Sequence, residues 1–136
     1  MTQEEKQLLV KDLSARLPYG VKFATKYESH KNNIYELIAV NKHCETVETF
    51  GAIWWNIEDI KPYLRPMESM TEKEKNEFIR FTSISMHRFR CEATDTEHWF
   101  NTWEEEDYLD AHHFDYRRLI PMGLALPATD GMYDFK

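Results

Sequence analysis

Apolar residues recur at helical spacing near the start of the chain, and polar signals bound this stretch on both sides. The recurring residues are Leu8, Leu9, Leu13 and Leu17. Thr2 and Glu5 precede them in the spacing of a capping box, in which a hydroxyl and a carboxylate bind two free amides at a helix start. Pro18 and Gly20 follow as helix breakers. The pattern therefore predicts a short amphipathic helix.

From Val21 the apolar positions alternate with polar or small ones, which is the period of a β-strand. The polar cluster 29–33 separates residues 21–27 from residues 34–40 and predicts the turn of a β-hairpin. Segments 46–50 and 52–55 predict a third and a fourth strand, with Gly51 as a bulge or bend. We expect one small antiparallel sheet of three or four strands, which can curl like an SH3-type barrel.

The stretch 57–78 joins two parts of different composition. Pro62 and Pro66 each lack a backbone donor, so the pattern predicts that neither a long helix nor a central strand runs through it. We expect residues 62–70 to form an ordered corner, with Tyr63 and Leu64 in the core.

The second half of the chain reads as mainly helical. Thr71 and Glu74 form another capping box, and a main helix is expected from Thr71 to about Arg90. The poor helix formers in 82–85 leave open whether 82–91 is helix or strand.

Residues 92–101 look irregular, and a third capping box at Thr102 predicts a short helix to His112 or His113. Asp115 can cap a single turn before Pro121, and the tail from Leu124 is expected to be a surface arm or to fray.

The fold predicted from these elements is α+β in one domain, 1–136. Residues 1–66 supply the helix and the sheet, and 67–136 supply a mainly helical acidic part. A length of 136 residues and an apolar content of 42% suit one compact domain.

The sequence predicts neither a membrane span nor a secretory signal, so a cytoplasmic location is the default expectation. Cys44 and Cys91 lack partner spacing and are expected to be reduced thiols.

The net charge of −7 is distributed unevenly. Residues 1–66 carry nine acids and nine bases, so the whole excess lies in 67–136. Residues 92–115 hold nine acids and no lysine or arginine. Such a block repels phosphate and attracts cations or basic partner surfaces, although a solvated face is the simpler interpretation.

Candidate catalytic groups are few. His112 and His113 beside Asp110 and Asp115 form the most metal-like cluster, but neighbouring helical residues point about 100° apart, so both imidazoles are not expected on one ion.

His87 with Cys91, or His43 with Cys44, suggests a thiol and its base, yet no orienting acid can be assigned. No glycine-rich phosphate loop is present. We predict no catalytic residue, no metal and no cofactor, and catalysis is the less favoured class.

The tryptophans suggest an interaction surface instead. In a strand, Trp54 and Trp55 point to opposite faces, so one is expected in the core and the other outside. Aromatic residues rimmed by charge are typical of protein-binding surfaces, although core packing is the simpler interpretation for each tryptophan. The candidate surface comprises Trp55, Trp99, Trp103, Glu104, Glu105, Glu106 and Asp107.

Three segments, LLVKDLSARLPYGVKF, IEDIKPYLRPMESMTEKEK and HFDYRRLIPMGLALPATDGMY, resemble small uncharacterised proteins carried by prophages and mobile elements of gut bacteria. The resemblance covers about half of the chain, at its ends and centre, and departs over roughly 28–55 and 84–103. It implies a phage-like or mobile-element context and no catalytic residues.

A non-catalytic accessory protein that binds another protein is the favoured function. The alternatives are a nucleic-acid-associated protein and an acidic nucleic-acid mimic. A nucleic-acid-associated protein would bind phosphate groups through clustered arginines, namely Arg80, Arg88, Arg90, Arg117 and Arg118. The oligomeric state stays open.

Overall fold

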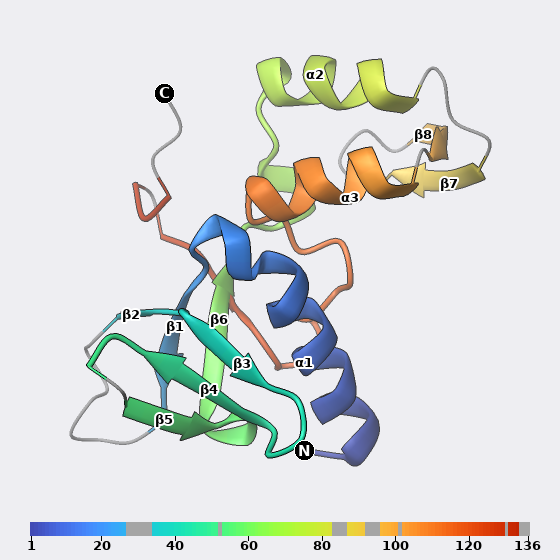
Figure 1. Ribbon diagram of the computed structural model, residues 1–136. Coiled ribbons are helices and arrows are strands. Elements are labelled where there is room, and N and C mark those ends of the chain that lie inside the picture. Colours follow the sequence, from blue (N-terminus) through green and yellow to red (C-terminus); the bar gives the residue numbers. More distant parts are fainter. Residues whose placement is uncertain are drawn as a thin grey trace.

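The computed structural model describes residues 1–26, 34–51, 53–82, 87–91, 96–100, 102–129 and 131–133. The side chains of residues 79–82, 87–91, 96–100 and 102–105 lie outside this description. Within these limits the chain has the predicted α+β class, with an N-terminal helix, small sheets and further helices (Figure 1).

The first helix, α1 (Gln3–Arg16), begins and ends where the sequence predicts. The Thr2 hydroxyl accepts from Glu5 N at 3.1 Å, and the Glu5 carboxylate accepts from Thr2 N at 3.0 Å. The chain leaves α1 through the 3-10 turn η1 (Leu17–Tyr19), which ends at Gly20 with a φ of 70°. Both helix signals in the sequence are therefore confirmed.

The strands within 22–64 and the short strand at 126–127 form two sheets rather than the single sheet or barrel expected. A four-stranded sheet has the order β2-β1-β6-β9 and consists of β1 (Lys22–Thr25), β2 (Tyr35–Glu36), β6 (Ile60–Leu64) and β9 (Leu126–Pro127). A three-stranded antiparallel sheet comprises β3 (Ala39–Asn41), β4 (Thr46–Thr49) and β5 (Ile53–Asn56). The predicted hairpin exists as β1 and β2, but the expected second strand continues into the other sheet as β3.

The main core lies where α1 packs against both sheets (Figure 1). Leu9 and Leu13 of α1 are fully buried there, together with Phe23 of β1 and Val47 of β4. Because residues of both sheets share this cluster, α1 holds the two sheets together.

Pro62 lies in a central strand, contrary to the prediction that no such strand passes through this stretch. β6 pairs with β1 in antiparallel register, Phe23 opposite Pro62, and with β9 in parallel. Lys26 N donates to Asp59 O, so Lys26 and Asp59 are a hydrogen-bonded pair. In an antiparallel ladder, hydrogen-bonded pairs alternate with pairs that exchange no hydrogen bonds. Phe23 and Pro62, three positions along, are therefore a pair of the second kind. The missing donor of Pro62 therefore costs no bond to β1.

The corner after β6 is ordered, as predicted. It contains the 3-10 turn η4 (Met67–Ser69) and leads into α2 (Glu72–Thr82). Leu64 is fully buried, whereas Tyr63 is only partly buried. Glu74 N donates to the Thr71 hydroxyl and Thr71 N to the Glu74 carboxylate, which confirms the second capping box.

The main helix ends earlier than predicted, at Thr82, and a hairpin follows it. The hairpin consists of β7 (His87–Cys91) and β8 (Thr96–Phe100), with His87 opposite Phe100. The open question over 82–91 is thus resolved as a strand at 87–91, and 96–100 is not irregular. Cross-strand pairing stabilises segments whose local propensity alone is undecided.

Helix α3 (Thr102–Ala111) starts at the predicted residue and ends in a Schellman motif. Phe114 N donates to Leu109 O and His113 N to Asp110 O, while His113 adopts a φ of 64°. Phe114 and Leu109 are buried in a second core with Phe78 of α2. This core joins α2 to α3 beside the corner.

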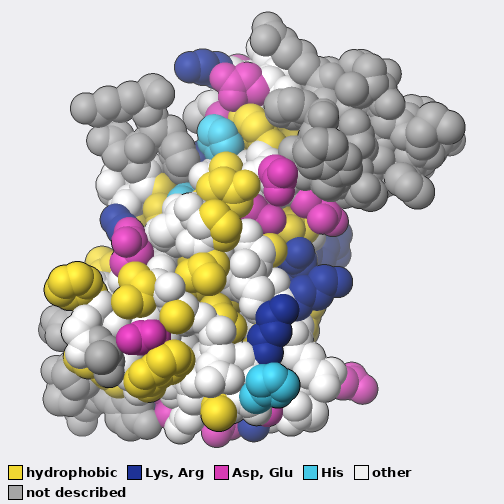
Figure 2. Space-filling view, viewed as in Figure 1, with side chains coloured by type: hydrophobic (Ala, Val, Ile, Leu, Met, Phe, Trp, Pro, Cys, Tyr) yellow, Lys and Arg dark blue, Asp and Glu magenta, His cyan; other side chains and the backbone are white. Residues whose placement is uncertain are grey.

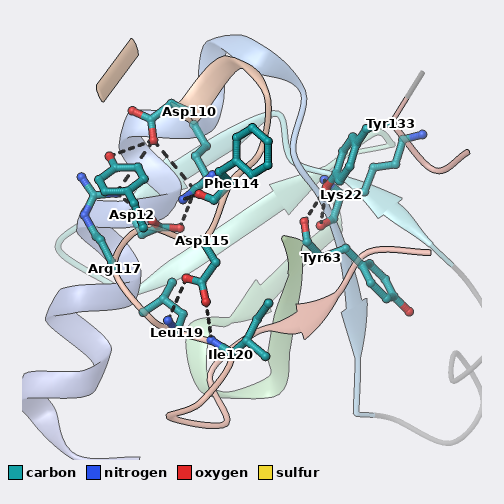
Figure 3. A network of polar contacts seen from close by, with 12 residues as sticks. Asp12, Lys22, Tyr63, Asp110, Phe114, Asp115, Arg117, Leu119, Ile120 and Tyr133 are labelled. Carbon is teal, nitrogen blue, oxygen red and sulfur yellow. Dashed lines mark hydrogen bonds and ion pairs between the residues drawn. The ribbon is translucent and has the colours of Figure 1, made fainter. Parts of the chain in front are cut away.

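The C-terminal segment is more deeply packed than the predicted surface arm. Leu124 is 4% exposed and belongs to the main core. Asp115 accepts from Leu119 N and Ile120 N, so it caps the following turn as predicted. The Tyr133 hydroxyl accepts from Lys22 N at 2.8 Å and donates to Tyr63 O at 2.7 Å, which fixes the segment against both β1 and β6 (Figure 3).

Candidate functional site

Trp55 of the predicted interaction surface lies in the core. Its side chain is 8% exposed, and its ring centroid lies 5.4 Å from that of Tyr35. The adjacent Trp54 is 49% exposed. The alternation of a strand separates the two indoles, as expected, but the exposed one is Trp54.

The other predicted surface residues lie on different elements from Trp55. Trp99 belongs to β8, and Trp103, Glu104 and Glu105 belong to α3, with side chains outside the described part. Glu106 is partly buried and Asp107 is exposed. Figure 1 places α3 at the opposite end of the molecule from β5, so Trp55 and the acidic residues do not form one surface.

An apolar surface does exist at the turn between β4 and β5, and we call it the hairpin surface. It comprises Ile38 at 45% exposure, Phe50 at 90%, Ile53 at 46% and Trp54 at 49%. Hydrophobic side chains reach the surface over this part of the molecule in Figure 2, where Figure 1 places β4 and β5. In the sequence, the adjacent apolar residues 53–55 are the signal for this surface. Their periodicity alone does not show which face of the strand is buried against the core.

The strand register explains how these residues come together. Thr49 pairs with Ile53, and Ile38 N donates to Glu48 O beside the same end of β4. Trp54 stands opposite Glu48 and points to the other face from Ile53. The hairpin surface therefore wraps around the end of the three-stranded sheet.

The outer edge of β5 adds polar groups to this surface. Ile57 N donates to Glu45 O, so this pair is hydrogen-bonded. Because hydrogen-bonded pairs alternate along an antiparallel ladder, the backbone groups of Trp55 and Ile53 also bond to β4. The backbone N–H and C=O groups of Trp54 and Asn56 consequently point away from β4. In the described part of the chain β5 pairs with β4 only.

A buried polar network joins α1 to the end of α3 and the turn after it (Figure 3). Arg16 and Asp12 are fully buried, and Arg16 Nε donates to Asp12 Oδ2 at 2.8 Å. Arg16 also donates to Phe114 O at 2.6 Å, and Arg117 donates to Asp12 Oδ1 at 2.7 Å. Arg16 Nη1 is also buried and has no hydrogen-bond partner among the described residues. Because the charges of Asp12, Arg16 and Arg117 offset one another away from solvent, the network is a structural connection.

Asp110 completes this network. Its Oδ1 accepts from the Tyr116 hydroxyl at 2.9 Å and lies 4.0 Å from Arg16 Nε. Burial raises the pKa of Asp110, while the charges of Arg16 and Arg117 act in the opposite direction. Two of the nine acids in 92–115, Asp110 and Asp115, are buried. They are therefore not part of the acidic face that the sequence suggests.

A second polar cluster lies at the start of α2. Arg65 binds the Glu74 carboxylate with two hydrogen bonds of 2.7 Å, and His112 Nδ1 lies 3.2 Å from Glu74 Oε2. Burial raises the pKa of Glu74, but the hydrogen bonds from Arg65 and Thr71 outweigh it and hold that pKa at about 2. Glu74 is therefore a carboxylate at neutral pH and is not a proton donor.

The two adjacent histidines face different partners. The His112 ring stacks on Tyr108 with centroids 4.2 Å apart, and the His113 ring stacks on Tyr133 at 3.7 Å. Burial, together with the nearby charge of Arg16, lowers the pKa of His113 to about 3. Among the described residues, no three His, Cys, Asp or Glu side chains lie close enough to hold a metal ion together.

The remaining candidates are the cysteines with their neighbouring histidines and the arginines, and only some of their side chains are described. Cys44 is an exposed free thiol, whereas the side chains of His87 and Cys91 are outside the described part. Arg117 belongs to the buried network and Arg118 is exposed, so these neighbours do not present one basic patch. The other arginines of the nucleic-acid hypothesis, Arg80, Arg88 and Arg90, have undescribed side chains.

No helix in the described residues has the length and apolar character needed to cross a membrane. Comparisons of the chain with protein-family models, with curated proteins and with solved structures find no match.

Proposed function

We propose that this protein is a non-catalytic accessory protein that binds another protein through the hairpin surface. The observation that carries the proposal is the exposure of Phe50 and Trp54, at 90% and 49%, beside Ile53 and Ile38. Four large apolar side chains around one turn are more than scattered surface residues, and such patches mark interaction sites.

The energetics favour a partner that covers this turn. Burying a large apolar side chain contributes roughly 1.5–3 kcal/mol, so Phe50 and Trp54 together offer several kcal/mol to a complex. Aromatic residues of this kind are also the usual hot spots of interfaces. The neighbouring Glu48, opposite Trp54, and the net charge of −7 favour a partner with a basic rim.

The edge of β5 supports a specific mode of binding. Trp54 and Asn56 direct their backbone donors and acceptors outward, as the alternation of the ladder requires. An extended segment of the partner can pair with this edge while its side chains contact Ile53 and Trp54. This is strand addition, in which the backbone supplies affinity and the side chains supply specificity.

The polar clusters do not favour an enzyme. Asp12, Arg16 and Asp110 bind one another in the interior, and Glu74 is occupied by Arg65. A catalytic site needs titratable groups that converge on a space open to a substrate. The resemblance of the three quoted segments adds a phage or mobile-element origin to the proposal, and we propose a cytoplasmic location.

The proposal is tested by affinity purification from the native host with three forms of the protein. The double variant Phe50→Ser/Trp54→Ser removes the aromatic part of the surface, and Met122→Ser is the control because Met122 is 44% exposed elsewhere. We expect wild type and control to retain the same protein and the double variant to lose it. Retention of that protein by a folded double variant contradicts the proposal.

A further inference from the structure

A groove lies between α1 and the turn that joins β3 to β4, at the other end of β4 from the hairpin surface. Its volume is about 540 Å³, which is within the usual range of small-molecule sites. The residues that line it are Gln3, Gln7, Val10, Lys11, Ser14, Lys42, His43 and Glu45. Those from α1 recur every three or four positions, so one face of the helix forms one wall.

Hydrogen-bond donors predominate in this groove. Lys11, Lys42, His43 and Gln7 present nitrogen atoms, and all four residues are exposed. Figure 2 shows lysine or arginine side chains and a histidine gathered over α1 and this turn. The groove thus concentrates positive charge in a chain whose net charge is −7.

The two lysines have no acidic partner within the described part of the chain. Several other cations are paired: Lys6 with Glu58, Lys26 with Asp59 and Arg65 with Glu74. Among the described residues no such ion pair involves Lys11 or Lys42. The acid that lines the groove, Glu45, accepts hydrogen bonds of 3.3 and 3.4 Å from Gln3 Nε2.

The turn that carries Lys42 and His43 is held in place. The Asn41 carboxamide oxygen accepts from His43 N at 3.0 Å and from Cys44 N at 3.1 Å, which is a side-chain-capped turn. The bond between Gln3 and Glu45 ties this turn to the start of α1. Val10, 9% exposed, supplies an apolar part of the lining.

We infer that this groove binds a small organic molecule through an oxyanion group, either a phosphate or a carboxylate. Two ammonium groups and an imidazole approach the space from two walls, and an oxyanion accepts hydrogen bonds from all of them. Val10 and the aliphatic stems of the lysines contact the carbon part of the ligand. The inference is independent of the hairpin surface.

The test is an NMR titration of the full ¹⁵N-labelled chain at constant ionic strength, so that general screening does not contribute. Ribose 5-phosphate, inorganic phosphate, succinate and uncharged ribose are added separately. We expect saturable shifts of the amide signals of Gln7, Lys11, Lys42 and His43 with a phosphate or with succinate, and none with ribose. The responding anion identifies the oxyanion.

Matched variants decide whether the groove is responsible. Lys11→Gln/Lys42→Gln is expected to weaken binding roughly tenfold, because it removes both ammonium groups that bind the oxyanion. Lys61→Gln/Lys73→Gln removes two exposed lysines from β6 and α2 and is expected to leave the affinity unchanged. The inference is wrong if no anion saturates these signals, or if both double variants bind equally.

Discussion

The Arg65 guanidinium binds both oxygens of the Glu74 carboxylate, with two hydrogen bonds of 2.7 Å. Arg65 follows β6 and Glu74 lies in the first turn of α2, so this pair locks the corner between sheet and helix. Glu74 also completes the capping box with Thr71, and one side chain therefore serves both the start of the helix and its attachment.

Replacing Glu74 with Gln is expected to lower the free energy of unfolding by about 2–3 kcal/mol at pH 7. The folded-state pKa of about 2 lies below the ordinary 4.5, so the carboxylate stabilises the fold above pH 4.5. This contribution is lost as the pH falls from 4.5 to 2. Urea unfolding of wild type and variant at several pH values measures the difference.

Glu72→Gln is the control for this prediction, because Glu72 lies in the same helical turn with its side chain 86% exposed. We expect that variant to change stability by less than about 0.5 kcal/mol. A difference between Glu74→Gln and wild type that persists unchanged at pH 2 would show that the charge of Glu74 is not the cause.

Replacing Arg16 with Met is expected to destabilise the protein by about 3–5 kcal/mol, because Asp12 and Asp110 lose a buried counter-charge. Thermal or urea unfolding measures the loss. Lys6→Met is the control in the same helix, since the ion pair of Lys6 with Glu58 is 3.5 Å long and partly exposed. Equal losses in the two variants would contradict a structural role for the network.

His113 is expected to make the fold sensitive to acid. Its folded-state pKa of about 3 lies below the ordinary 6.5, so between these values the unfolded chain binds a proton that the folded chain does not. Stability should fall with decreasing pH over this window, by at most about 1.4 kcal/mol per pH unit. His113→Asn, which tolerates the φ of 64°, should reduce that slope.

The protonation state of His113 can also be observed directly. Imidazole NMR signals recorded from pH 7 to pH 4 should show His113 neutral throughout while the protein stays folded. A His113 signal that titrates near pH 6.5 in the folded protein would refute the burial effect.

The local signals in the sequence were reliable, whereas signals that depend on distant contacts were not. Thr2 with Glu5 and Thr71 with Glu74 mark helix starts because a capping box involves only residues within one turn. The placement of Pro62 in a central strand depends on the register with β1, and the β7–β8 hairpin depends on cross-strand pairing. The periodicity of apolar residues shows neither the register between β6 and β1 nor the pairing of β7 with β8.

The candidate surface shows the same limit. Two adjacent tryptophans in a strand must face opposite sides, but only the packing of Trp55 beside Tyr35 decides which one is buried. The buried network joins Asp12 and Arg16 to Asp110 and Arg117, which lie about a hundred positions further along the chain. Charge counts attribute such residues to the surface, because burial of charge is rare unless the groups are paired.

The central claim, that a partner protein pairs with the β5 edge, is tested most directly by amide hydrogen exchange of the free and partner-bound protein. The partner is the protein retained by wild type and lost by Phe50→Ser/Trp54→Ser. Binding is predicted to slow exchange at the outward amides of Trp54 and Asn56. Unchanged exchange at both amides in a saturated complex would contradict the account.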